Sequence, residues 1–139
     1  MHTWFLMLLM MMIMLASAEG HEAIDQLNFE EKVLNSDKPW LLEFYSDMCG
    51  SCREFAPTFE QVASALSSSE IQIGMVGIDQ KEGMDLANAL GILEEGIPNV
   101  RLFSRANRNG LKIMPGEMYS KTQLLESIQS HLATLKDEL

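Results

Sequence analysis

Cysteine is scarce in this chain of 139 residues, because Cys49 and Cys52 are the only two. A fold held together by several disulfide bridges is therefore excluded, and so is a zinc site built from two cysteine pairs. Two cysteines three positions apart can still form a dithiol that opens and closes as a disulfide, or an inert structural pair.

Positive charge is also in short supply. Lys and Arg together number 10 against 20 Asp and Glu, which gives a formal net charge of −10. Nucleic acid is excluded as a partner, since binding it requires basic patches. The acidity instead favours solubility in a crowded compartment. No Asn-x-Ser/Thr sequon is present, so N-glycosylation is not expected. The sequence predicts neither a metal nor a cofactor.

The one long apolar run is too short to cross a membrane. It extends from Trp4 to Ala16, about 13 residues against the roughly 20 that a spanning helix needs. Ala16-Ser17-Ala18 then supplies small residues at positions −3 and −1 of a cleavage site. We interpret residues 1–18 as a secretory signal peptide, after whose removal no stable membrane insertion is expected. No Lys or Arg precedes the run, so an uncleaved anchor or a different start of the chain remains an alternative.

The chain ends with a tetrapeptide that retrieval receptors of the endoplasmic reticulum bind: Lys136, Asp137, Glu138 and Leu139. A charged, frayed helix end is the simpler interpretation of the same residues. Because a signal peptide and a retrieval signal agree on one compartment, we predict a protein of the endoplasmic reticulum lumen with the retrieval receptor as a partner. The predicted organisation is a signal at 1–18, one domain at 19–135 and the retrieval signal at 136–139.

Hydrophobic periodicity predicts alternating strands and helices. Strands are expected at about 23–27 (on a sheet edge), 40–46, 71–78, 100–103 and 111–114. Helices are expected at about 28–35, 53–66, 83–90 and 124–135. Asn28 and Glu31 have the spacing of a capping box, and Asn109-Gly110 is a hairpin turn signal. The order predicts an α/β fold, with a mixed sheet of four or five strands covered by helices on both faces.

Glu43 is the anomaly in the strand predicted at 40–46. Its neighbours are so apolar that the strand should be buried on both faces. A carboxylate in such a place costs free energy unless it is paired or protonated. An edge strand with Glu43 facing water is the alternative, against which the apolar neighbours argue.

Several short motifs occur together at a spacing that one known family shares: Leu42-Glu43-Phe44-Tyr45, Cys49-Gly50-x-Cys52, Ala56-Pro57, Ile78-Asp79, Gly96-Ile97-Pro98 and Ser120-Lys121-x-x-Leu124. On these residues the sequence resembles a thioredoxin domain, and specifically a single-domain member of the protein disulfide isomerase family. The resemblance covers roughly residues 25–133 and implies the thioredoxin fold.

The resemblance also implies a role for each active-site residue. Cys49 is expected at a helix start, where unpaired N–H groups and the helix dipole favour a thiolate, and is the attacking nucleophile. Cys52 lies one turn further and resolves the mixed disulfide; Gly50 and Ser51 form the loop between the two cysteines of this redox-active disulfide. Glu43, buried beneath Cys52, should titrate above an ordinary glutamate and shuttle the Cys52 proton.

Ile97-Pro98 resembles the cis-proline loop that presents backbone groups to an extended substrate, although an ordinary trans turn is the alternative. Ser51 and Met48 stand where disulfide isomerases usually have His and Trp, and Met75 stands where related enzymes often have Lys. A serine cannot supply an imidazolium to stabilise the thiolate, so we expect a potential more reducing than that of a typical isomerase. Two extra residues within 93–95 are expected to alter the substrate surface.

These residues predict a thiol–disulfide oxidoreductase or isomerase. Its expected partners are cysteine-containing folding polypeptides, with glutathione or another oxidoreductase for recycling. A retained lumenal chaperone or adaptor with little redox activity is the alternative. Cytosolic redox transfer is a third interpretation, which the two terminal signals oppose.

Overall fold

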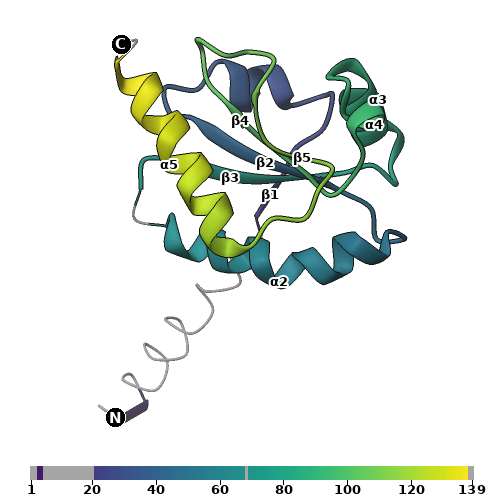
Figure 1. Ribbon diagram of the computed structural model, residues 1–139, viewed down its shortest axis with the longest axis horizontal. Helices are drawn as coiled ribbons and strands as arrows, with labels where there is room; N and C mark the ends of the chain where they lie inside the picture. Colours follow the sequence, from purple (N-terminus) through teal and green to yellow (C-terminus); the bar gives the residue numbers. More distant parts are fainter. Residues whose placement is uncertain (1–2, 5–20, 68, 138–139) are drawn as a thin grey trace.

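The computed structural model describes residues 3–4, 21–67 and 69–137 of the chain (Figure 1). The proposed signal peptide, apart from positions 3–4, lies outside the described residues, and so do Glu138 and Leu139. Across the described ranges, no helix combines the length and the apolar character needed to span a membrane.

Five strands form one mixed sheet in the order β1-β3-β2-β4-β5. Their bounds are β1 Glu22–Ala23, β2 Trp40–Tyr45, β3 Gln72–Gly77, β4 Asn99–Phe103 and β5 Leu111–Pro115. β3 pairs in parallel with β1 and β2, whereas β4 is antiparallel to both β2 and β5. The predicted α/β fold is therefore confirmed, and the expected edge strand is β1, shorter and earlier than predicted.

Helices cover both faces of this sheet, as predicted. Their bounds are η1 Glu30–Leu34 (a π-helix), α2 Gly50–Ala65, α3 Lys81–Ala89, α4 Ile92–Glu95 and α5 Lys121–Asp137. Residues of α2 and α5 share one hydrophobic cluster with the sheet, and residues of η1 and α3 share the other. Figure 1 shows α2 and α5 together on one side of the strands. The short helix α4 was not predicted.

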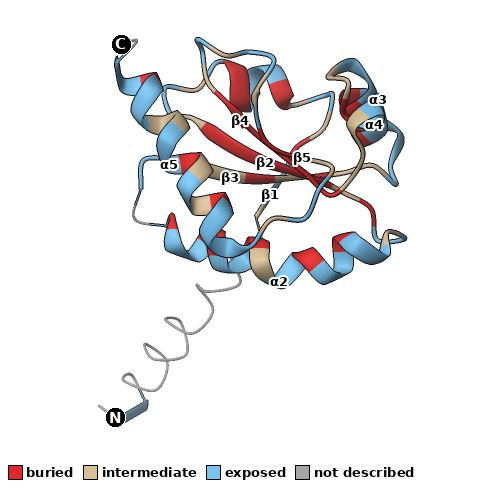
Figure 2. Ribbon diagram, viewed as in Figure 1, coloured by how far each residue is buried: buried red, intermediate tan, exposed pale blue. Residues whose placement is uncertain are grey.

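β2 lies at the centre of the sheet because nearly all its side chains are apolar. Successive side chains of a strand point to opposite faces. Leu41 accordingly enters the cluster with α2 and α5, whereas Leu42 and Phe44 enter the cluster with η1 and α3. Figure 2 shows the buried residues concentrated in the central strands and on the helix faces turned toward them. The prediction of a strand buried on both faces is confirmed.

The first helical turn begins earlier than the capping-box spacing predicted. Phe29 N donates to the carbonyl oxygen of Asp25 at 3.0 Å, so the turn starts there. Asp25 Oδ1 accepts from Leu27 N at 2.8 Å, while Asn28 Oδ1 accepts from Asp25 N at 2.9 Å. This reciprocal pattern is a capping box in which Asp25 is the cap and Asn28 reaches back to it. The helix η1 itself has Phe29 as its N-cap and no side-chain cap bond, so the prediction that Asn28 caps it was wrong.

The β4–β5 hairpin is present, but its connection is not the tight turn that Asn109-Gly110 predicted. Residues 104–110 join the two strands. Gly110 has φ +80°, whereas no described residue other than glycine has a positive φ. A two-residue type I′ turn needs positive φ at both central residues, so Asn109 and Gly110 do not form one.

Candidate functional site

The two cysteines lie where β2 leads into α2, and they form a disulfide. Cys49 is the N-cap of α2, with extended backbone at φ −93° and ψ 115°. The Cα atoms of the pair are 5.1 Å apart, and Cys52 N donates to Cys49 Sγ at 3.1 Å. Cys49 is half-buried, whereas Cys52 is only 4% exposed. Solvent therefore reaches the first sulfur more readily than the second, which is the order that the sequence predicted.

Asp79 fixes the loop that leads to Cys49. It follows β3, and its two carboxylate oxygens accept from Ser46 Oγ at 2.6 Å and from Asp47 N at 2.9 Å. Ser46 Oγ in turn accepts from Met48 N at 3.1 Å. The hydrogen bonds from Ser46 and Asp47 lower the pKa of Asp79, which keeps it charged at neutral pH. The sequence indicated Asp79 only as part of a family motif. Its contact with Ser46 could have been predicted, because each of these polar residues comes shortly after one of two neighbouring parallel strands.

The first turn of α2 favours negative charge on Cys49. It contains no Asp or Glu, and the free N–H groups of a helix start stabilise an anion. Arg53 lies in this turn and donates through Nη1 to the carbonyl oxygen of Asp47 at 2.8 Å. Ser51 Oγ lies 3.3 Å from Cys49 Sγ, so its hydroxyl can donate to a thiolate there. This surrounding favours a lowered thiol pKa when the disulfide is open.

Glu43 is buried in the central strand without a partner. The residue is 1% exposed, and neither carboxyl oxygen has a hydrogen-bond partner. Its neighbours in the sheet are Met75 on β3 and Val100 on β4. Burial, assisted by the negative charge of Glu60, raises the pKa of Glu43 to about 8. The alternative of an edge strand with Glu43 in water was wrong, and Met75 supplies no cation.

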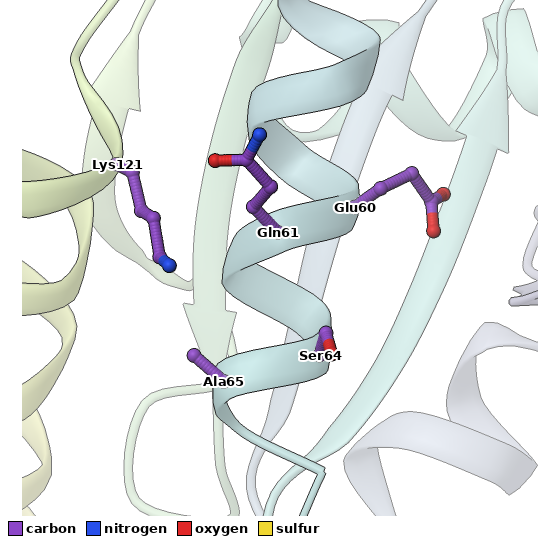
Figure 3. Close-up of a pocket in the computed structure, with 5 residues that line it drawn as sticks. All are labelled: Glu60, Gln61, Ser64, Ala65 and Lys121. Carbon is purple, nitrogen blue, oxygen red and sulfur yellow. The ribbon is translucent and has the colours of Figure 1, made fainter.

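Glu60 lies further along α2, in an exposed position. Its Oε1 is 2.9 Å from His21 Nε2, and the His21 ring lies edge-on to Phe59. Glu60 helps to line a hollow on the surface of α2, together with Gln61, Ser64, Ala65 and Lys121. In Figure 3, Glu60 and Lys121 lie on opposite sides of the helix. This hollow begins about two helical turns beyond Cys52 and is separate from the cysteine centre.

The Ile97-Pro98 peptide bond is cis, so the alternative of a trans turn was wrong. Phe44, near the C-terminal end of β2, pairs with Asn99, the first residue of β4. Pro98 therefore lies at the end of the sheet where β2 finishes. The loop that leads to Cys49 also begins where β2 finishes, so the two segments lie at the same end of the sheet. Pro98 is buried, and Ile97 contacts the hydrophobic cluster of η1 and α3.

The end of α5 does not join this arrangement. Lys136 and Asp137 are exposed at the last turn of that helix. Figure 1 shows this end of the chain far from the start of α2. In the described part of the chain, no three His, Cys, Asp or Glu side chains gather in a way that could hold a metal ion.

Comparison with known proteins agrees with this geometry. The family model described as Thioredoxin matches residues 21–130. The chain is 31% identical over 121 residues to the protein disulfide-isomerase tigA of Aspergillus niger, covering 86% of this chain and 32% of that protein. It is 34% identical over 82 residues to protein disulfide-isomerase A6 of Mus musculus, covering 59% of this chain and 17% of that protein.

A thioredoxin of Rickettsia bellii is 30% identical over 105 residues, which cover 76% of this chain and 92% of that protein. The chain thus spans a third or less of the disulfide-isomerase relatives but nearly the whole of this thioredoxin. The strand order, the cysteine pair at the start of α2 and the extent of the family match lead to one conclusion. The chain belongs to the thioredoxin family.

Proposed function

We propose that this chain is a thiol–disulfide oxidoreductase that forms, reduces or rearranges disulfides in folding secretory proteins. One observation carries the proposal: a half-buried sulfur at a helix N-terminus is joined to a second, buried sulfur one turn later. Exchange requires one thiolate that substrate can reach and a second thiol that cannot be reached first. The names of the disulfide-isomerase relatives support the same chemistry.

In reduction, the Cys49 thiolate attacks one sulfur of a substrate disulfide. A mixed disulfide forms between that sulfur and Cys49, and the other substrate sulfur leaves as a thiolate that takes a proton from solvent. The N–H groups at the start of α2 and the Ser51 hydroxyl favour the attacking charge. Oxidation follows the same steps in reverse, and glutathione or another oxidoreductase restores the starting state.

Cys52 then attacks the Cys49 sulfur, closes the enzyme disulfide and releases the second substrate sulfur. Cys52 must first lose its proton, and Glu43 in its carboxylate form is the proposed acceptor. In the closed form a pKa of about 8 keeps most Glu43 protonated at neutral pH. That is the state in which the group should be found after it has taken the Cys52 proton.

The Ile97-Pro98 loop is the proposed substrate-binding segment, because it shares a sheet edge with the cysteine loop. Met48 beside Cys49 is 87% exposed and adds an apolar, adaptable side chain to this surface.

The proposed location is the lumen of the endoplasmic reticulum. The small-residue pattern Ala16-Ser17-Ala18 and the terminal Lys-Asp-Glu-Leu support it. In this proposal residues 1–18 are removed, residues 19–135 fold as the domain, and residues 136–139 bind the retrieval receptor.

The proposal is tested by replacing each cysteine in turn. Cys49→Ser should reduce catalysed insulin reduction and scrambled-ribonuclease reactivation to background, because no attacking thiolate remains. Cys52→Ser should instead accumulate a mixed disulfide with substrate, visible as an added mass under non-reducing conditions, because attack persists without resolution. Glu54→Gln is the control, since it alters an exposed residue in the same helix and leaves both sulfurs and Ser51 in place.

Activity that survives Cys49→Ser would contradict the proposal. If that variant still suppressed aggregation of an unfolded protein as well as the wild type, the alternative of a retained chaperone or adaptor would be favoured.

A further inference from the structure

A partly buried ion cluster lies next to the loop that carries Pro98, around the side chain of Glu95. Glu95, the last residue of α4, accepts through Oε1 from Arg101 Nη2 on β4. The same oxygen is 3.1 Å from Lys112 Nζ on β5. The other oxygen, Oε2, accepts from Asn99 Nδ2 at 3.3 Å. One carboxylate therefore joins α4 to both strands of the β4–β5 hairpin.

The cluster is shielded enough for its charges to hold one geometry. The Arg101 and Glu95 side chains are 5% and 15% exposed. Burial alone would raise the pKa of Glu95, but hydrogen bonds from Lys112, Asn99 and Arg101 outweigh it and hold the pKa below its usual range. The carboxylate is therefore charged at neutral pH. Removing one partner of a buried pair leaves the other charge uncompensated, so this contact resists opening.

An irregularity in the β4–β5 ladder brings both cations to the same carboxylate. Val100 pairs with Met114, but the next residue, Arg101, pairs with Lys112. Such a bulge redirects side chains locally. Arg101 Nη1 also donates to the carbonyl oxygen of Asn109 at 2.9 Å, which ties the hairpin loop to the same group.

The cluster also reaches the backbone next to Pro98. Asn99 Nδ2 donates to the carbonyl oxygen of Gly96 at 3.2 Å. On the far side, the carbonyl oxygen of Glu95 lies so close to Gly116 that a Cβ there would be 2.2 Å from it. The loop is therefore held through its first residue, through the residue after Pro98 and through a backbone contact with the segment after β5.

We propose that Glu95 is a positioning residue, which fixes the Ile97-Pro98 loop relative to the cysteine pair by tying α4 to β4 and β5. The inference rests on the proposed function, in which an extended substrate binds along this loop. It goes further because exchange chemistry itself requires no carboxylate here. Glu95 touches neither sulfur and takes no proton; its effect on the reaction passes through the backbone of residues 96–98.

Glu95→Gln tests this, because the amide has nearly the same size but no charge. Hydrogen exchange of the Gly96 and Ile97 amides should become about tenfold faster. The kcat/KM for a peptide disulfide should fall on the order of tenfold, mainly through a higher KM, because the peptide needs the loop. The rate with a small aromatic disulfide should stay within about twofold. Glu94→Gln is the matched control, since it removes the same charge from an exposed neighbour on α4.

The inference would be overturned if amide hydrogen exchange at residues 96–97 were unchanged. It would also be overturned if kcat/KM fell equally for the peptide disulfide and the small aromatic disulfide. The exchange measurement needs no activity, so an inactive wild type would refute the proposed function while faster exchange still supported the positioning role. Should Glu95→Gln fail to fold, Lys112→Met is the second variant. It removes one of the partners of Glu95, and the Lys112 side chain is 60% exposed, so the fold should tolerate the change. A smaller increase in exchange at residues 96–97 is expected for that variant, and no increase would overturn the inference.

Discussion

At the scale of single residues, Glu43 is the least ordinary feature of the molecule. It lies in the central strand between Met75 and Val100, and both its oxygens lack a partner. A charge in such a place is costly, so the group stays protonated until the pH nears its raised pKa of about 8. Without a nearby cation, its protonation depends on burial and on the negative charge of Glu60.

This raised pKa predicts how the stability of the oxidised protein depends on pH. Above pH 4.5 the carboxyl ionises in the unfolded chain but stays protonated in the fold up to about pH 8. The folded state then binds more protons, so its contribution to stability is full below pH 4.5 and falls as the pH rises to about 8. The loss for this one group is on the order of 5 kcal/mol, since each pKa unit corresponds to about 1.4 kcal/mol.

Glu43→Gln should remove that fall, because an amide does not ionise. Urea unfolding of the oxidised wild type and variant from pH 4 to pH 9 measures it, since the other groups contribute equally to both curves. The difference in free energy of unfolding should grow in favour of Gln as the pH rises. Parallel curves would contradict the assignment. Glu54→Gln, an exposed glutamate on α2, is the control and should leave the curve unchanged.

At the scale of elements, a comparison of two glycines distinguishes the cost of a positive φ from the cost of a steric clash. Gly91 and Gly116 have φ +73° and +80°, values that side chains disfavour. A Cβ at Gly91 would meet nothing within 4 Å, whereas one at Gly116 would collide with the carbonyl oxygen of Glu95. Only the second glycine is therefore required by space as well as by φ.

Gly91→Ala should cost about 1–2 kcal/mol of unfolding free energy, which is the conformational penalty alone. Gly116→Ala should cost a further 1–3 kcal/mol, because the backbone of Glu95 must move. Chemical denaturation of both variants measures the difference. Equal costs would show that α4 gives way freely and would weaken the view that this contact holds the loop.

Elements with a long apolar pattern could be predicted from sequence, whereas their ends could not. Phe55, Phe59 and Val62 recur at helical spacing and are all buried on α2. The cap of the first helix was mispredicted because the Asn28 side-chain oxygen accepts from Asp25 N, in the preceding turn, and not from an N–H of the helix. Asn109-Gly110 signalled a tight turn, but the strand ends lie further apart in sequence than a two-residue turn allows.

At the scale of the whole molecule, the sequence located the cysteine pair, Glu43 and Pro98 because each belongs to a short motif with a fixed place in the fold. The ion cluster around Glu95 could not be found in this way. Its members come from α4, β4 and β5, and the bulge that brings Arg101 and Lys112 together has no local pattern. Such a cluster depends on distant segments meeting, which periodicity does not report.

The acidity of the whole molecule predicts which substrates react fastest. Residues 1–18 contain no Asp, Glu, Lys or Arg, so the net charge of −10 belongs to the rest of the chain. A field of that sign attracts cationic peptides from a distance that salt controls, about 30 Å at 0.01 M and 3 Å at 1 M ionic strength. A Lys-flanked peptide disulfide should therefore be reduced on the order of tenfold faster than a Glu-flanked one at low salt. Stopped-flow rates should converge at 1 M salt; a ratio that salt does not change would place the preference in direct contacts at the site.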